Sequence, residues 1–287
     1  MTTLPDRYDV LLTTLKCIRG QVDQVYLTLP YVARRFNQPY PEPCQEIKDL
    51  CTIVRCQEDY GPICKIYGAL MMEDDPNTLI MTLDDDNLVP DDFVQTFLEK
   101  HQLQPKGVIT GCGVLLGCGV NFFSINTTIH NLNYCKNLLG FTCPEKGRAV
   151  NILQGFSGVL YQRHMFPDKD QLYDELLHYS MENNDVFKSD DILISAYLNQ
   201  NDIKIYTFNN MPLVQSIYFE DNALSADCMK MFATFKRAFY QCQEWGMFKT
   251  IEQTYLGESP IFKIPFACFL IIVLIITIIL YIYYVIV

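Results

Sequence analysis

The sequence has few basic residues relative to acidic ones. Its 22 lysines and arginines face 33 aspartates and glutamates, which gives a net charge of −11. A nucleic-acid-binding surface needs a basic face to neutralise phosphates, so this charge balance argues against a nucleic-acid partner. A local basic pocket for one diphosphate is still compatible with the composition.

Motifs with paired cysteines or a phosphate-binding glycine loop are also missing. The twelve cysteines are spaced irregularly, without C-x-x-C or a zinc-finger pattern. We therefore expect reduced, mostly buried thiols, with a disulfide framework as the less favoured alternative. No G-x-x-x-x-G-K-[ST] segment is present, which argues against a P-loop enzyme. Apolar residues make up 49% of the 287, so the chain can bury a sizeable core.

The C-terminal segment from Ile264 to Val287 contains no charged residue. As a helix it would exceed the ~30 Å hydrocarbon core of a bilayer, where a helix satisfies its own backbone hydrogen bonds. The start, MTTLPDRYDVLLTTL, has acidic and basic residues before any apolar stretch and does not fit a signal peptide. We therefore predict a single-pass tail anchor at 262–287, with residues 1–258 on the cytosolic side of the membrane.

Strand-like and helix-like segments alternate through the first ~115 residues. The helical patterns cover 10–21, 60–72 and 90–102, and the strand patterns cover 22–30, 50–56, 77–85 and 106–116. This alternation predicts an α/β fold with a mainly parallel sheet and helices on both faces. Further along, 150–163 is typical of strand, glycine loop and strand, and 189–203 of a helix with Ser189 as its N-cap.

The segment LIMTLDDDNLVP, residues 79–90, ends a strand-like run in Asp84, Asp85 and Asp86. Adjacent carboxylates raise one another's pKa unless a cation lies among them. Ligands of open α/β sheets bind beyond the carboxyl ends of the strands, and oxygen ligands select Mg²⁺ or Mn²⁺. The triplet therefore predicts a hard-cation site for a diphosphate substrate. A solvated acidic turn that caps the next helix is the alternative.

Two later segments carry further candidate chemistry. In KSDDILIS, Asp190 and Asp191 open a predicted helix. A carboxylate there could act as general base toward an acceptor hydroxyl, although aspartate is also a common helix cap. In QGFSGVLY, two glycines flank Phe156 and Ser157. They permit close backbone approach to a ligand, and they also fit an ordinary tight turn.

Four segments, in the order EDYGPICKIYGAL, DPNTLIMTLDDDNLVP, LQGFSGVLYQR and KSDDILISAYL, resemble a family of GT-A type nucleotide-sugar glycosyltransferases from microbial and large-virus genomes. The resemblance covers roughly residues 4–210. It implies a Rossmann-like GT-A catalytic domain over 1–258 and Mn²⁺ or Mg²⁺ as cofactor. The implied reaction passes a sugar from a nucleotide-diphosphate donor to a hydroxyl of a glycan, lipid or protein.

The resemblance also implies roles for single residues. Asp84 would approach the ribose or the sugar and share the metal site with Asp86, supported by Asp85. Asp191 would be the general base of an inverting enzyme, with Asp190 beside it. The other positions that the resemblance places near the nucleotide, the donor sugar or the acceptor are Arg7, Asp59, Lys65, Gly155 and Ser157.

Two other functions stay open on the residues alone. Metal-dependent phosphoryl or nucleotidyl transfer also uses paired aspartates, usually with two metal ions and a glycine loop. A non-catalytic, membrane-anchored scaffold with an acidic face would tolerate exchange of its carboxylates. Hydrolysis of nucleotide sugars with and without Mn²⁺ separates the three functions, because only the glycosyltransferase predicts metal-dependent turnover of a sugar donor.

Overall fold

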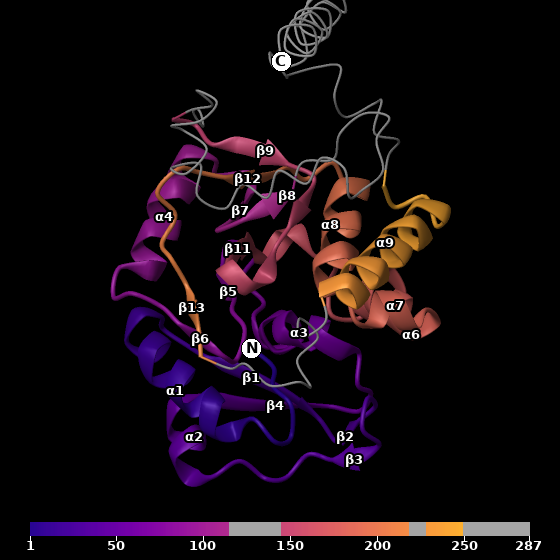
Figure 1. Cartoon of the computed structure of the whole chain (residues 1–287). Helices are drawn as coiled ribbons and strands as arrows, with labels where there is room; N and C mark the ends of the chain where they lie inside the picture. The colour runs from indigo at the N-terminus through magenta and orange to yellow at the C-terminus, as the bar shows by residue number, and fades with distance from the viewer. Residues whose placement is uncertain (115–144, 218–227, 249–287) are drawn as a thin grey trace, which may run out of the picture. The chain divides into compact units, whose positions relative to one another are not determined.

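The computed structural model describes residues 1–114, 145–217 and 228–248 (Figure 1). These residues fall within the first of two structural units, residues 1–249. The cysteines whose side chains are described are free thiols, as the spacing predicts. No helix in the described ranges is long and apolar enough to cross a membrane. The predicted anchor at 262–287 lies outside the described residues.

The first part of the chain forms a parallel β-α-β unit. Helix α1 (Tyr8–Ile18) continues into the short helix η1 (Arg19–Gln21) and precedes β1 (Tyr26–Pro30). Strand β1 pairs in parallel with β4 (Thr52–Cys56), and the helix α2 (Gln45–Leu50) lies in the connection between them. The same connection holds a hairpin of β2 (Val32–Ala33) and β3 (Gln38–Pro39). The first residues of the chain also run beside β1, where Thr2 forms a parallel bridge to Thr28.

The next stretch confirms the alternation that the sequence predicts. The short helix η2 (Gly61–Ile63) leads into α3 (Cys64–Met72), which packs against β1 and β5 (Leu79–Thr82). After β6 (Asn87–Leu88), helix α4 (Phe93–Leu103) packs against β7 (Val108–Thr110). A two-residue strand, β8 (Gly113–Val114), follows. The helix and strand types are therefore correct here, and the ends differ by a few residues.

The main sheet is mixed, so the prediction of a mainly parallel sheet is wrong. Its strand order is β5-β11-β7-β12-β9, with β11 (Val159–Gln162), β12 (Ile205–Thr207) and β9 (Arg148–Val150). Strand β12 pairs with β7 in parallel, and the other three pairings are antiparallel. The reason is that β11 inserts between β5 and β7 in the opposite direction. A pattern of alternation before residue ~115 holds no information about that later strand.

The register of β11 places a turn at the end of β5. Because Val159 lies opposite Thr82 in an antiparallel pair, the residues before Val159 run alongside the residues after Thr82. This turn contains the short helix η3 (Gly155–Ser157) and ends at Gly158, whose φ is +82°. A Cβ on Gly158 would lie 2.6 Å from the ring of Phe93, so the fold requires glycine there.

A group of helices covers the other side of these strands from α4 (Figure 1). Helix α8 (Asp190–Gln200) packs on β10 (Ile152–Leu153), which pairs with β8. Helix α9 (Cys228–Glu244) packs on α8 and α7 (Asn184–Phe187), and α7 contacts α6 (His178–Glu182). Helical turns η4 (Arg163–Met165) and η5 (Tyr173–Leu177) connect β11 to α6. Ser189 is the N-cap of α8 as predicted, but its hydroxyl makes no capping hydrogen bond.

The chain then returns to the aspartate triplet. Strand β13 (Gln215–Ser216) pairs in antiparallel fashion with β6, which directly follows the triplet. The backbone N–H of Ile217 donates to the carbonyl oxygen of Asp86 at 2.8 Å. A segment about 130 residues away in sequence therefore fixes the backbone of the triplet.

Candidate functional site

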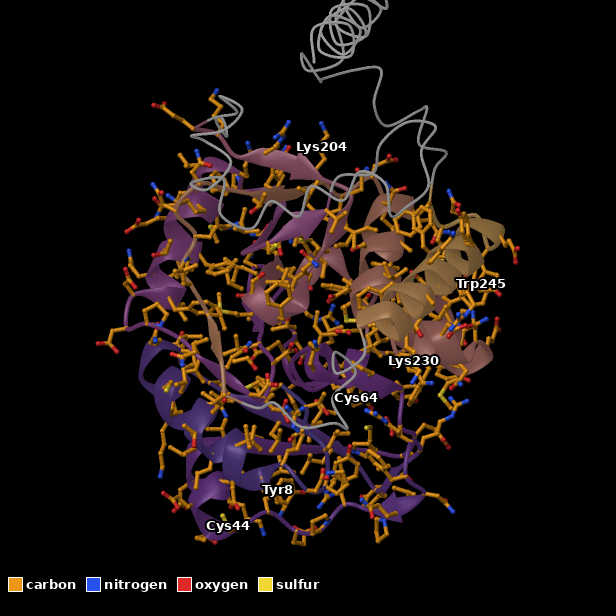
Figure 2. All side chains as sticks on the ribbon, viewed as in Figure 1. Tyr8, Cys44, Cys64, Lys204, Lys230 and Trp245 are labelled. Atoms are coloured by element: carbon orange, nitrogen blue, oxygen red, sulfur yellow. The ribbon has the colours of Figure 1, made fainter. Side chains whose placement is uncertain are left out.

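Lys65 is the centre of the candidate site. It lies in the first turn of α3, next to Cys64, which Figure 2 marks in the interior of the molecule, and 8% of its side chain is exposed. Its ammonium nitrogen lies 2.6 Å from Oδ1 of Asp84 and 2.9 Å from Oδ2 of Asp190. Lys65 therefore joins the end of β5 to the start of α8.

Asp191 and Gly155 complete this side of the site. The backbone N–H of Gly155 donates to Oδ1 of Asp191 at 2.9 Å. A Cβ on Gly155 would lie 2.7 Å from that oxygen and 3.2 Å from the ammonium nitrogen of Lys65. Only glycine permits this close approach without displacing a charged group. The turn before β11 is therefore shaped to fit the carboxylate of Asp191.

Arg7 neutralises part of the negative charge of Asp85 and Asp86, the two members of the triplet that Lys65 does not pair with. Its guanidinium contacts Oδ1 of Asp85 at 3.0 Å and Oδ2 of Asp86 at 2.7 Å. The hydroxyl of Thr3 donates to the second oxygen of Asp85, and the hydroxyl of Thr14 donates to the backbone carbonyl of Asp85 at 2.8 Å. Asp85 therefore connects the triplet to the first residues of the chain and to α1.

The charges of this cluster do not balance among the described residues. The cluster contains five carboxylates and two side-chain cations, and the nearby Met1 amino group is uncharged near pH 7 because burial lowers its pKa to about 5, so three negative formal charges are left over. Its carboxylates are Asp84, Asp85, Asp86, Asp190 and Asp191, and its cations are Arg7 and Lys65. A buried excess of negative charge favours either protonation or the uptake of a cation.

The pKa shifts agree with this imbalance. Burial, and then the negative charge of Asp190, raise the pKa of Asp191 well above its usual range, although Lys65 opposes the shift. Burial raises the pKa of Asp85 to about 6 against the opposing charge of Arg7. The pKa of Asp86 is also raised, first by burial and then by Asp84.

Lys65 stays charged in spite of its burial. Burial alone would lower the pKa of its ammonium group. The carboxylates of Asp190, Asp84 and Asp191 outweigh that effect and raise the pKa well above its usual range. Lys65 is therefore a fixed positive charge beside carboxylates of raised pKa, among them Asp191.

The residues present fit a hard divalent cation that is shared with a phosphate ligand. Asp84 and Asp86 are the more exposed members of the triplet, with 29% and 19% of their side chains accessible. Oxygen donors of this kind suit Mg²⁺ or Mn²⁺, which protein sites often hold through one or two carboxylates while the substrate supplies further oxygens. Within the described ranges, no group of three or more His, Cys, Asp or Glu side chains could hold a metal ion.

Two of the predicted residues have other contacts. The carboxylate of Asp59 accepts the backbone N–H groups of Arg34 and Gly61, both at 2.8 Å, and so shapes the loop before α3. The buried hydroxyl of Ser157 donates to the carbonyl oxygen of Gln154 at 2.9 Å within its own turn. The structure brings the other predicted residues together in the cluster.

Sequence reasoning missed two residues that hold the site together. Thr3 bonds to Asp85, and the amide of Asn87 donates to the backbone carbonyl of Phe156 at 2.8 Å. Asn87 directly follows the triplet, so its position was a usable signal. Thr3 offered no such signal, because its partner lies 82 residues further along the chain.

Comparisons with known proteins identify no family for this chain. No protein-family model matches it, and no curated protein matches it.

Proposed function

We propose that the protein is a metal-dependent glycosyltransferase with a GT-A type catalytic domain. It takes a sugar from a nucleotide-diphosphate donor and passes it to a hydroxyl acceptor. The main support is the meeting of four sequence segments at one buried lysine. Lys65, Asp84, Gly155 and the pair Asp190 and Asp191 come from four separate parts of the chain: Lys65 pairs with Asp84 and Asp190, and Gly155 bonds to the adjacent Asp191.

The first half of the site would bind the donor. Asp84 and Asp86 would hold the divalent cation, and that cation would supply Lewis-acid stabilisation of the charge on the leaving diphosphate. Arg7 and Lys65, which pair with these carboxylates, would be the cations that contact the phosphate oxygens. Asp85 keeps the triplet in place through Thr3 and Arg7.

The second half of the site would act on the acceptor. Asp191 accepts the proton of the acceptor hydroxyl, and the acceptor oxygen then bonds to the anomeric carbon of the donor sugar. The bond from that carbon to the diphosphate breaks at the same time, and the diphosphate leaves with the electron pair. The raised pKa of Asp191 suits a group that must hold a proton after transfer. This role implies inversion at the anomeric carbon.

The alternatives receive less support from the same residues. Phosphoryl or nucleotidyl transfer usually uses two metal ions and a phosphate-binding glycine loop, and the sequence contains no G-x-x-x-x-G-K-[ST] segment. A scaffold gains nothing from burying carboxylates beyond the number of cations that neutralise them, because burial of unbalanced charge destabilises the fold.

Thermal denaturation with a panel of nucleotide sugars tests the donor half. A ligand that binds the native state raises its apparent stability by mass action. We expect one class of nucleotide sugar to raise the melting temperature in Mn²⁺ and to have no effect in EDTA. A panel that leaves the melting temperature unchanged in Mn²⁺ contradicts donor binding.

The membrane anchor is a separate proposal that rests on the uncharged segment 264–287. Removal of 262–287 should release the protein from membranes while donor binding is retained. Pelleting of the shortened protein with membranes after a carbonate wash contradicts the anchor.

A further inference from the structure

Acidic residues are almost absent from one long part of the sequence. From Lys100 to Pro167 the chain has six lysines and arginines but a single acidic residue, Glu145. The whole chain has 33 acidic residues, so an even distribution would place several of them in this part. The net charge of −11 therefore arises outside it, and a surface built from this part can be positive on an otherwise acidic protein.

Basic residues from three segments meet at one corner of the main sheet. We call this group the basic corner, and its members are Lys100, Lys106, Lys146, Arg148 and Lys204. The backbone N–H of Val108, at the start of β7, donates to the carbonyl oxygen of Lys204 at 2.9 Å. The side-chain amide of Gln104 donates to the carbonyl oxygen of Lys146 at 2.6 Å. Strand β9, which begins at Arg148, pairs with β12, which begins directly after Lys204. The three segments are therefore neighbours, at the edge where Figure 2 marks Lys204.

The basic corner is open to solvent and keeps a net positive charge. Three of its members are exposed residues, namely Lys106, Lys146 and Lys204, and the other two are half-buried. Five positive formal charges stand against three negative ones, because three acidic residues lie beside these positions in the sequence: Glu99, Glu145 and Asp202. Leu103, the last residue of α4, is 49% exposed and adds apolar area to this surface.

The basic corner and the candidate site lie at opposite ends of the strands. Strands β5 and β7 both pair in antiparallel fashion with β11, and β12 is parallel to β7, so β5, β7 and β12 run in the same direction. Lys106 and Lys204 precede β7 and β12, whereas Asp84 follows β5. A surface that binds at the basic corner therefore leaves the candidate site accessible.

An anionic bilayer is the partner that these features favour. Anionic lipid headgroups attract lysine and arginine side chains within a Debye length, ~8 Å at physiological ionic strength. The same headgroups repel the acidic remainder of the protein, so the basic corner is the part that can approach them. Lysine stems can also lie along apolar area such as that of Leu103 while their ammonium groups reach the phosphates. The net charge of −11 opposes a long nucleic acid, which would extend beyond the corner.

We propose that the basic corner docks on the headgroups of anionic phospholipids and so orients the domain on a membrane surface. This inference goes beyond the proposed function and does not depend on the reaction at the candidate site. The proposed anchor in 264–287 favours it, because a tether holds the bilayer at a high effective concentration.

The test measures how fast single lysines are acetylated in the full-length protein bound to bilayers. One bilayer is phosphatidylcholine alone, and the other also contains phosphatidylserine. Acetic anhydride labels accessible lysines, and mass spectrometry reads each position separately. The reporters of the basic corner are Lys106, Lys146 and Lys204. Lys16 and Lys48 are the controls, because their side chains are 55% and 39% exposed and they lie on α1 and α2.

We expect phosphatidylserine to slow the acetylation of the three reporters about three- to tenfold. Each basic residue near an anionic surface adds an attraction that corresponds to about a fivefold change in the docked population. Lys16 and Lys48 should be labelled at the same rate in both bilayers. About 1 M salt should abolish the protection, because it shortens the Debye length to ~3 Å. Equal protection of reporters and controls, or protection that survives this salt concentration, overturns the inference.

Two double variants test whether the positive charges are responsible. Lys106→Gln with Lys146→Gln should remove the protection of Lys204, whereas Lys16→Gln with Lys48→Gln should leave it intact. Substitutions of exposed lysines change stability little, so both variants should fold. Protection of Lys204 that is the same in the two variants contradicts docking through the basic corner.

Vesicle flotation separates this inference from the proposed anchor. Flotation of the full-length protein with phosphatidylcholine vesicles tests the anchor alone, because these vesicles carry no net charge. If the protein floats only with phosphatidylserine and the reporters are protected there, the anchor is contradicted and the inference stands. If polyglutamate or DNA protects the reporters and phosphatidylserine does not, the basic corner binds a soluble polyanion and the inference is wrong.

Discussion

In two acidic regions of the molecule, the pKa values of aspartate side chains are shifted in opposite directions. Between α7 and α9, the carboxylate of Asp185 forms a bidentate ion pair with the guanidinium of Arg237, with N–O distances of 2.7 and 2.8 Å. The hydrogen bonds from Arg237 lower the pKa of Asp185, although its partial burial opposes the shift. In the cluster around Lys65, burial raises the pKa of Asp191, Asp85 and Asp86.

The difference lies in the number of cations that accompany each carboxylate. Asp185 has one partner and remains in contact with solvent, so its charge is balanced where it stands. The central cluster has five carboxylates for two side-chain cations among the described residues. The Asp185–Arg237 pair is a balanced contact, whereas the fold keeps the carboxylates of the cluster close together although they repel one another. Such a cluster has affinity for a further cation.

Asp191→Asn gives the largest expected effect. Asparagine keeps the oxygen that accepts the N–H of Gly155, but it cannot take a proton. We expect turnover of donor to acceptor to fall ~10²–10⁴-fold while the affinity for nucleotide sugar is kept, as loss of a positioned base implies. Steady-state kinetics and donor titrations measure the two quantities. Asp185→Asn serves as the control, and near-normal turnover in Asp191→Asn would mean that Asp191 only holds the turn at Gly155 through its hydrogen bond.

Lys65→Met removes the buried cation that joins the two halves of the cluster. Breaking a buried ion pair by removing one partner costs about 3–5 kcal/mol, because the carboxylates that it paired remain buried. We expect a loss of that size in urea denaturation at pH 7. Lys16→Met is the matched control, since the Lys16–Glu46 pair is more than half exposed and should contribute less than about 1 kcal/mol. Equal losses of stability in Lys65→Met and Lys16→Met would show that the buried ion pairs of Lys65 contribute no more than an exposed pair.

The pH dependence of stability tests the charge imbalance directly. The native pKa of Asp85 is about 6, above its ordinary value of 3.8, so the native state binds more protons than the unfolded state between these values. Because burial lowers the pKa of the Met1 amino group to about 5, that group makes the protein less stable as the pH falls from 7 to 5. Asp85 alone should make the metal-free protein more stable by about 1 kcal/mol over the same range. The raised pKa of Asp191 acts in the same direction. Urea denaturation of wild type and Asp85→Asn in EDTA at pH 5, 6 and 7 isolates the contribution of Asp85 as the difference in stability between the two proteins, and a difference that does not rise toward pH 5 contradicts it.

Asp185→Asn gives the smallest expected effect. More than half of the Arg237 side chain is exposed, so solvent screens the pair and its loss should cost roughly 0.2–1 kcal/mol. Because the native pKa of Asp185 is lowered, its contribution is complete above about pH 4 and is lost only as the pH falls below that value. The cost should therefore be the same at pH 5 and pH 7. If the stability loss of Asp185→Asn differed between pH 5 and pH 7, Asp185 would not differ from the cluster carboxylates in its pH dependence.

Local sequence patterns predicted the elements that carry the site but not all of its contacts. The apolar run before Asp84 and the helical pattern after Gly61 indicated β5 and α3, and both are present. The direction of β11 was not predictable, because strand pairing depends on residues far apart in the sequence. The same limitation applies to Ile217, which bonds to the backbone of Asp86.

The sequence did not identify which cations neutralise the aspartate triplet. Three adjacent aspartates require a cation, and the sequence favoured a metal ion. The structure places Arg7 and Lys65 there, although the resemblance assigns both residues to the nucleotide. Arginine and lysine positions carry no signal of their partners in a single sequence, since either side chain reaches several residues around it.

Hydrolysis of nucleotide sugars by wild type and Asp86→Ala, each in Mn²⁺ and in EDTA, tests the central claim most directly. Asp86 is partly exposed, and its replacement removes a negative charge from a cluster with too many, so the variant should fold. We predict that wild type hydrolyses one class of nucleotide sugar in Mn²⁺ and none in EDTA, and that Asp86→Ala loses this activity while its melting temperature is maintained. Equal hydrolysis in Mn²⁺ and EDTA, or unchanged turnover in Asp86→Ala at saturating Mn²⁺, would contradict the account.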